Sequence, residues 1–244
     1  MYSKDFYINA SDVDEYKCLK PSGIFKLFQD TTVQGVEETP FNTTWLTNNH
    51  LMWVITRVNV EIVKLPKYLE NVNLSTYPCE TMKVIYPRHF FIKDDKGNIL
   101  VKMSTTWALL DDRTRTFSSI GPDVLQLGFE KHDYQLPLPK RLKPSLGELV
   151  DTRVIRYSDC DLNRHLNNTR YIDYIFDLFD GDFFKGHKIS NIRIDYLSEI
   201  LEKEELSLYK YVINEEENIY QVIGKVHDKT CFVSELTFKN NLTK

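Results

Sequence analysis

The sequence predicts an α+β protein made of two tandem copies of one unit, in each of which an antiparallel sheet wraps around a long helix. The tetrapeptide Ser-Asp-x-Asp begins at Ser11 and again at Ser158, and each occurrence precedes a stretch with apolar residues at helical spacing. Segments in which apolar and polar residues alternate follow each stretch, as in half-buried strands. Because two copies can pair sheet edges that one copy would leave exposed, we expect them to join as a pseudo-dimer.

The composition indicates a folded chain with a sizeable core. Of the 244 residues, 42% are hydrophobic and 13% are aromatic, which is ample for a packed interior. The net charge of −4 argues against a nucleic-acid-binding protein, because such proteins usually carry a basic excess. No apolar run is long enough to span a bilayer, and the start lacks the pattern of a signal peptide. We therefore expect a cytoplasmic protein with no nucleic-acid partner and no membrane span.

The four cysteines give no sign of a metal centre or a redox pair. Cys18, Cys79, Cys160 and Cys231 lie far apart, and the sequence contains no C-x-x-C motif. A chain of this length does not need disulfides to fold, so we expect all four to be reduced. No cofactor and no metal is predicted.

In the first copy, a short strand at residues 6–8 leads to a helix that begins at Pro21, where proline has no amide hydrogen to lose. We expect Gly35 to let this helix end near Val36. The face expected to be buried consists of Ile24, Leu27, Phe28 and Thr31.

Alternation predicts the remaining strands of the first copy, with a hairpin turn at residues 94–98. The strands are expected at residues 51–55, 58–62, 72–77, 84–93 and 99–111. From residue 121 to residue 147 the chain has prolines at positions 122, 137, 139 and 144 and no sustained period. We interpret residues 121–147 as a linker between an N-terminal domain, residues 1–120, and a C-terminal domain, residues 148–244.

The second copy repeats the first with an offset of 158 − 11 = 147 residues. Its first strand is expected at residues 151–157, and its helix should bury a face that includes Tyr171, Ile175 and Phe179. The same offset carries Ile24 and Phe28 onto Tyr171 and Ile175, so the apolar faces of the two helices coincide. Closing strands are expected at residues 206–211, 220–227 and 231–238.

Polar side chains crowd the segment between the second Ser-Asp-x-Asp motif and its helix. Asp161, Asn163 and His165 occupy every second position, so we expect their side chains to share one side of an extended segment. Asn167 and Asn168 follow, and either can cap the first turn of the helix. The first copy has no such cluster at the same place, so only the second copy is expected to carry a site.

This segment resembles the signature Asp-x-Asn-x-His-x-Asn-Asn-x-x-Tyr of the acyl-acyl carrier protein thioesterases, a family with two hotdog domains in one chain. The matching residues are Asp161, Asn163, His165, Asn167, Asn168 and Tyr171. The resemblance implies hydrolysis of fatty acyl thioesters in fatty acid biosynthesis, with the acyl chain in the N-terminal domain and the catalytic residues on the C-terminal one. The implied partner is acyl carrier protein (ACP), which bears the acyl group on phosphopantetheine. Whether two chains pair into a homodimer is open.

Glu199 completes the predicted site. Asn163 cannot accept a proton, and a lone histidine benefits from a carboxylate partner. The segment from Asp195 to Ile200 resembles the family segment Glu-Tyr-x-x-Glu-Cys, in which the second glutamate is catalytic and matches Glu199. Because Ile200 replaces the family cysteine, an acyl-enzyme at this position is excluded, and attack by a water molecule remains.

The predicted catalytic residues are therefore Asp161, Asn163, His165 and Glu199. We expect His165 and Glu199 to activate the water, Asn163 to donate to the thioester carbonyl or position the water, and Asp161 to orient its neighbours. Asn167 is interpreted as a helix cap, and Tyr171 as core packing. Cys160 is not favoured as a nucleophile, because a neighbouring carboxylate raises the pKa of a thiol.

Two other functions remain open: an acyl-CoA thioesterase on the same fold, and a non-catalytic acyl-binding or regulatory hotdog protein. The polar cluster speaks against the second. Bulky residues that suit an apolar ligand in the first copy are Phe25, Phe28, Trp45, Trp53 and Phe91. Basic residues that are candidates for docking an acidic carrier protein are Arg164, Arg170, Lys185, Lys188 and Arg193.

Overall fold

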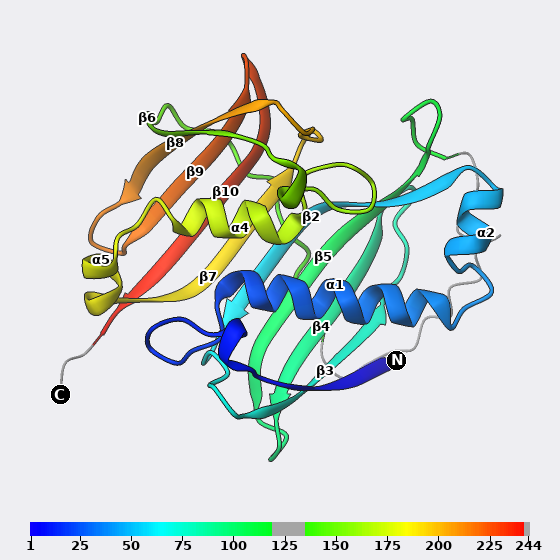
Figure 1. The fold of residues 1–244 in the computed structure, drawn as a ribbon. Coiled ribbons are helices and arrows are strands. Elements are labelled where there is room, and N and C mark those ends of the chain that lie inside the picture. The colour runs from blue at the N-terminus through cyan, green and yellow to red at the C-terminus, as the bar shows by residue number, and fades with distance from the viewer. Residues whose placement is uncertain (119–134, 242–244) are drawn as a thin grey trace. The chain divides into compact units, whose positions relative to one another are not determined.

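The computed structural model describes residues 1–118 and 135–241, and the chain divides into two compact units, Met1–Pro139 and Lys140–Lys244 (Figure 1). The linker predicted at residues 121–147 lies partly outside the described residues. Each unit combines an antiparallel sheet with helices, as expected of an α+β fold.

The N-terminal unit has one long helix, α1, which lies across one face of its sheet (Figure 1). Its strands are β1 (Tyr2–Tyr7), β2 (Leu51–Ile62), β3 (Asn71–Pro78), β4 (Tyr86–Asp94) and β5 (Ile99–Asp111). Its helices are η1 (Ala10–Asp12), α1 (Pro21–Glu37) and α2 (Thr43–Asn48). The described strands pair antiparallel in the order β1-β3-β4-β5-β2.

The C-terminal unit repeats this topology. Its strands are β6 (Glu148–Val154), β7 (His187–Tyr196), β8 (Glu205–Asn214), β9 (Ile219–Val226) and β10 (Lys229–Asn240). Its helices are η2 (Tyr157–Asp159), α4 (Asn168–Phe176) and α5 (Gly181–Gly186). The strand order β6-β8-β9-β10-β7 matches that of the first unit position by position. The predicted duplication is thereby confirmed.

Helix α1 buries the predicted face but ends later than expected. Pro21 is its first residue, and the four predicted face residues are at most 9% exposed. The prediction that Gly35 ends the helix is wrong, because α1 continues to Glu37. A Cβ atom at Gly35 would lie 3.2 Å from Cγ of Tyr2 on β1, so a side chain there would crowd that ring. Gly35 thus serves the packing of β1 against α1.

The turn between β4 and β5 is built as predicted for a hairpin. Gly97 has a φ of +82°, a conformation that glycine adopts without steric cost. The carboxylate of Asp94 accepts hydrogen bonds from the backbone N–H groups of Lys96 (3.0 Å) and Asn98 (2.8 Å). These contacts fix the register of the two strands.

Helix α4 is shorter than the apolar spacing suggested, because it ends at Phe176 and Phe179 lies beyond it. Phe179 is nevertheless 7% exposed, since it packs among aromatic rings contributed by α4, α5, β9 and β10. The rings around it are Phe183, Phe184, Tyr220 and Phe238. Aromatic side chains therefore occupy this part of the C-terminal unit.

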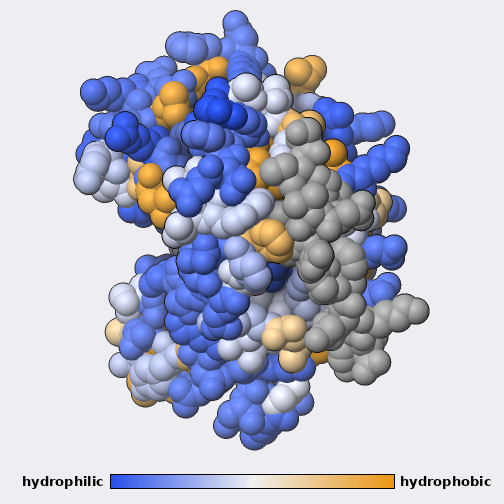
Figure 2. All heavy atoms as spheres, turned by 90° about the vertical axis from the view of Figure 1, so that its right-hand side faces the viewer, coloured by the Kyte–Doolittle hydropathy of each residue, from blue (hydrophilic) through white to orange (hydrophobic). Residues whose placement is uncertain are grey.

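The surface in Figure 2 is mainly hydrophilic, and apolar residues form small separate groups on the face that is drawn. Within residues 1–118 and 135–241, no helix is both long and apolar enough to cross a membrane.

Candidate active site

The polar segment before α4 folds as a tight turn, and the prediction that it is extended is wrong. Oδ1 of Asp161 accepts hydrogen bonds from the backbone N–H groups of Asn163 (2.8 Å) and His165 (3.4 Å). The backbone N–H of Asp161 donates to the carbonyl of His165 at 2.8 Å, and Arg164 has a φ of 65°. A carboxylate that binds its own downstream backbone replaces the alternation of an extended strand.

The same turn occurs in the N-terminal unit, around Asp14. Oδ1 of Asp14 accepts from the backbone N–H groups of Tyr16 and Cys18, both at 2.9 Å. Its backbone N–H donates to the Cys18 carbonyl at 2.8 Å, and Lys17 has a φ of 58°. The turn is thus a duplicated structural element, in which Cys18 occupies the place of His165.

His165 and Glu199 lie together although they are 199 − 165 = 34 residues apart. Nε2 of His165 is 3.2 Å from Oε2 of Glu199, and their side chains are 15% and 40% exposed. Backbone contacts hold the two segments together. His165 forms an isolated antiparallel bridge with Leu201, and the N–H of Leu166 donates to the carbonyl of buried Ile200 at 2.8 Å.

The matching segments of the N-terminal unit are joined in the same way but lack this pair. Cys18 bridges Lys67, and the N–H of Leu19 donates to the carbonyl of Pro66 at 2.7 Å. Pro66 therefore corresponds to Ile200, and the residue before it, Leu65, corresponds to Glu199. With a thiol and an isobutyl group at these places, the first copy has no imidazole–carboxylate pair at the corresponding site.

Asn163 lies at the exposed tip of the turn, two residues before His165. Its backbone N–H binds Asp161. Among the described residues, its side-chain amide makes no hydrogen bond. The structure therefore places Asn163 in the same turn as His165, with an amide that is available to a ligand.

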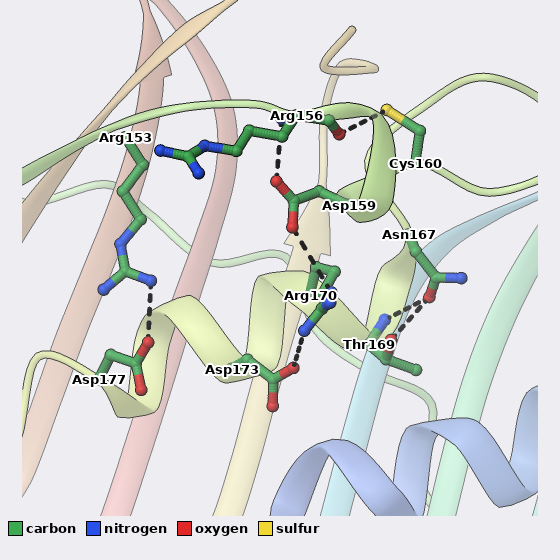
Figure 3. A network of polar contacts seen from close by, with 9 residues as sticks. All are labelled: Arg153, Arg156, Asp159, Cys160, Asn167, Thr169, Arg170, Asp173 and Asp177. Atoms are coloured by element: carbon green, nitrogen blue, oxygen red, sulfur yellow. Dashed lines mark hydrogen bonds and ion pairs between the residues drawn. The ribbon is translucent and has the colours of Figure 1, made fainter. Parts of the chain in front are cut away.

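The start of α4 is capped as predicted. The side chain of Asn167 accepts hydrogen bonds from N–H (2.9 Å) and Oγ1 (2.8 Å) of Thr169, which satisfies a donor that has no partner within the helix. Figure 3 shows this cap beside Arg170, whose guanidinium lies between the carboxylates of Asp159 (3.6 Å) and Asp173 (3.3 Å). These contacts tie the helix to the turn that carries His165.

Tyr171 packs in the core behind the site, as predicted. Its ring is 4% exposed and meets the rings of Tyr196 and Phe232 edge-on, with both centroid distances 5.2 Å. Burial, followed by the neighbouring Tyr196, Cys231, Asp161 and Glu199, raises the pKa of Tyr171 well above its usual range. The phenol is therefore protonated at neutral pH.

Cys160 is next to the turn but is poorly suited to act as a nucleophile. Burial raises the pKa of its thiol, and the charges of Glu202, Asp159 and Asp161 raise it further. A raised pKa lowers the fraction of thiolate, which is the reactive form. All four cysteines of the chain are free thiols.

Three of the five candidate docking residues are engaged with acidic side chains. Arg170 contacts Asp159 and Asp173, Lys185 lies 2.6 Å from Asp182, and Arg193 lies 2.6 Å from Glu235. Within the described part of the chain, the side chains of the other two, Arg164 and Lys188, form no ion pair.

Sequence reasoning missed Glu204, which the charged run at residues 199–205 concealed. Oε2 of Glu204 accepts a hydrogen bond from the backbone N–H of Leu201 at 2.7 Å, in the turn that follows Glu199. Glu70 makes the same contact with Lys67 at 2.8 Å. The two glutamates are 204 − 70 = 134 residues apart, the same offset that relates Leu65 to Glu199, and this repeat is the signal by which the sequence could have revealed Glu204.

No group of three or more His, Cys, Asp or Glu side chains in residues 1–118 and 135–241 is arranged to hold a metal ion. What the site does contain is an imidazole against a carboxylate, a neighbouring amide and a helix N-terminus. Such groups can accept a proton from water and stabilise developing negative charge.

Comparison with known families gives two matches along the chain. Residues 1–127 match the family described as the acyl-ACP thioesterase N-terminal domain, and residues 148–235 match the acyl-ACP thioesterase C-terminal domain.

Two curated plant proteins illustrate the sequence similarity. Oleoyl-acyl carrier protein thioesterase 1 of Arabidopsis thaliana, a chloroplastic protein, is 23% identical over 218 residues, which cover 81% of this chain and 60% of that protein. The chloroplastic dodecanoyl-[acyl-carrier-protein] hydrolase of Umbellularia californica is 24% identical over 215 residues, which cover 82% and 56%. The chain thus spans less than two thirds of the length of these relatives.

Solved structures share the fold over nearly the whole chain. The crystal structure of an acyl-ACP thioesterase from Bacteroides thetaiotaomicron has a TM-score of 0.87 at 23% identity, with 97% of both chains covered. The 12:0-ACP thioesterase from Umbellularia californica has a TM-score of 0.84 at 20% identity, covering 98% of this chain and 97% of that one. The fold predicted from the sequence, two tandem hotdog domains, is thereby confirmed.

Proposed function

Because the chain belongs to the acyl-ACP thioesterase family, as its match to both domain families shows, we propose that it hydrolyses fatty acyl-ACP to free fatty acid and ACP. The observation that carries the proposal is the contact of 3.2 Å between Nε2 of His165 and Oε2 of Glu199, on the copy that kept the polar turn. The first copy, which has Cys18 at the matching place, has no such pair and serves as an internal comparison.

In the proposed reaction, water attacks the thioester carbonyl carbon and gives a proton to the His165–Glu199 pair. Glu199 orients the imidazole and stabilises its positive charge. The carbon–sulfur bond then breaks, and the sulfur of phosphopantetheine leaves with a proton returned from the pair. Ile200 is fully buried and has no nucleophilic atom, which supports attack by water over an acyl-enzyme at this position. Thioesters have a good leaving group, so proton transfer and donors aimed at the oxyanion are sufficient.

Asn163 and Asp161 have different roles in this proposal. Asn163 presents an exposed amide in the turn that carries His165, where it donates to the thioester carbonyl or positions the water. Asp161 acts through the backbone, because its carboxylate holds the N–H groups of Asn163 and His165. Asp14 holds its own turn in the same way without an adjacent histidine, which supports an orienting role for Asp161.

We assign the acyl-chain pocket to the N-terminal domain, residues 1–120, and the chemistry to the C-terminal domain, residues 148–244, with residues 121–147 as linker. A cavity of about 10 Å³, room for about one water-sized sphere, supports this division. Its lining is wholly apolar and comes from α1, β3, β4 and β5. An acyl chain needs more space, so its entry requires lining side chains such as Phe28 and Phe90 to move. These two rings lie edge-on with centroids 5.3 Å apart.

The decisive experiment is incubation of the protein with ACPs that carry acyl groups of different lengths, followed by identification of the acids released. The same acyl groups on CoA provide the comparison, because an acyl-CoA thioesterase would cleave them at least as fast. Release of acid from ACP substrates supports the proposal. Binding of acyl-ACP without any release of acid would instead indicate an acyl-binding protein.

The proposed setting is the cytoplasm, and the free thiols of all four cysteines are in keeping with a reducing compartment. A homodimer remains a further proposal, which sedimentation of the protein at several concentrations tests directly.

A further inference from the structure

A short turn between Glu199 and β8 is closed by the side chain of Glu204. Oε2 of Glu204 accepts the backbone N–H of Leu201 at 2.7 Å, and the backbone N–H of Glu204 donates to the Leu201 carbonyl at 3.3 Å. Lys203, between them, has a φ of 71°, in the left-handed region that non-glycine residues seldom adopt. The carboxylate contact therefore offsets the strain of a turn that would otherwise tend to open.

This turn is the backbone link between the two members of the site pair. Leu201 forms the bridge with His165, and its neighbour Ile200 accepts the N–H of Leu166 at 2.8 Å. Glu199 precedes these residues directly in the chain. A change in the turn at Leu201 therefore moves the carboxylate of Glu199 relative to the imidazole of His165.

We propose that Glu204 is a positioning residue that sets the geometry of the His165–Glu199 pair through the turn at Leu201. The proposal rests on the thioesterase function argued above. Glu204 does not touch the pair itself, and its effect passes through the backbone.

The N-terminal unit contains the same turn without the pair, which separates a positioning role from a purely structural one. Oε2 of Glu70 accepts the backbone N–H of Lys67 at 2.8 Å, and Leu69 has a φ of 67°. Lys67 bridges Cys18 as Leu201 bridges His165. Glu70 also lies 3.9 Å from Lys64 in an exposed ion pair, which contributes little to stability.

The test compares Glu204→Ala with Glu70→Ala in the full chain, with kcat and KM measured on acyl-ACP and with Tm measured by thermal unfolding. Both variants lose the same turn contact, so we expect both to lower Tm. Only Glu204→Ala should lower kcat, by roughly 10- to 100-fold, with KM nearly unchanged, because the catalytic pair is misplaced. Glu204→Gln, which keeps an acceptor oxygen, should recover most of the lost kcat.

A second readout needs no substrate. The ¹⁵N chemical shifts of the His165 imidazole, assigned by loss of its signals in His165→Gln, report its contact with Glu199. In Glu204→Ala they should move toward those of Glu199→Gln, whereas in Glu70→Ala they should stay at the wild-type values. Should Glu204→Ala fail to fold, Glu204→Asp keeps the charge, draws the carboxylate away from Leu201, and should shift the signals in the same direction.

Unchanged imidazole shifts in the folded Glu204 variants would overturn the proposal, as would an equal fall of kcat in Glu204→Ala and Glu70→Ala. Failure of the proposed function gives a different result, since the wild type would then release no acid from any acyl-ACP. The imidazole shifts would still decide whether Glu204 positions the pair.

Discussion

Asp14 and Asp161 hold the same position in two copies of one turn, and each accepts two backbone N–H groups through Oδ1. The residue four positions later is Cys18 in one copy and His165 in the other. The turn is therefore older in function as a structural element than as a site, in the sense that its contacts need no catalytic residue. The two copies supply matched controls for each prediction about the site.

Replacing His165 by alanine should lower kcat by about 10²- to 10⁴-fold, because the group that accepts the proton from water is lost. Glu199→Gln should lower kcat as well, since the amide cannot stabilise the charged imidazole. The rates are measured by release of acid from acyl-ACP. Cys18→Ala, at the matching place in the first copy, is the control and should retain wild-type turnover. Near-normal hydrolysis by His165→Ala would remove His165 from the site.

Asp161→Ala and Asp14→Ala should destabilise the protein to a similar degree, by about 1–3 kcal/mol, because each leaves two backbone donors without a charged acceptor. Urea denaturation followed by circular dichroism measures this loss. Only Asp161→Ala should also lower kcat, because its turn carries Asn163 and His165. If both variants kept full turnover, the orienting role of Asp161 would be wrong.

Asn167→Ala should reduce the free energy of unfolding by about 1 kcal/mol, because the first turn of α4 loses its cap. Asn167→Asp keeps an acceptor oxygen and should restore most of the stability. Asn168→Ala is the control, since Asn167 provides the cap contact. Equal losses in the Asn167 and Asn168 variants, measured by chemical denaturation, would contradict this interpretation.

Cys160→Ser should leave kcat close to the wild-type value, because water and not this thiol attacks the thioester. Burial, together with Glu202, Asp159 and Asp161, raises the pKa of Cys160, so its thiolate fraction at pH 8 is smaller than that of an unperturbed thiol. Alkylation by iodoacetamide should therefore be slower than for a model thiol and should accelerate as the pH rises toward the raised pKa. Mass spectrometry of the labelled peptide measures the rate, and a large loss of turnover in Cys160→Ser would contradict the water mechanism.

Local patterns in the sequence predicted the elements that depend on neighbouring residues. Pro21 marks the first residue of α1, and Gly97 lies in the predicted hairpin. The places where prediction failed involve contacts across the chain. Gly35 looked like a helix end, but its small size accommodates the ring of Tyr2, 33 residues earlier (35 − 2 = 33). Such a contact leaves no periodic signal.

The turn at Asp161 illustrates a second kind of failure. Alternating polar residues favoured an extended segment, yet the Asp161 carboxylate binds the backbone of Asn163 and His165 and bends the chain. A side chain that hydrogen-bonds to nearby backbone competes with extended structure. The first copy carries an aspartate at the same place, so the comparison of the two halves held the correct information.

The sequence by itself determined the duplicated α+β architecture and which half carries the polar cluster, because helical spacing, strand alternation and an internal repeat are local properties of the chain. Only the tertiary structure decided that Nε2 of His165 lies 3.2 Å from Oε2 of Glu199 and that Glu204 closes the turn behind that contact. These relationships depend on backbone bridges between segments far apart in the sequence, whose geometry follows from packing of the whole unit.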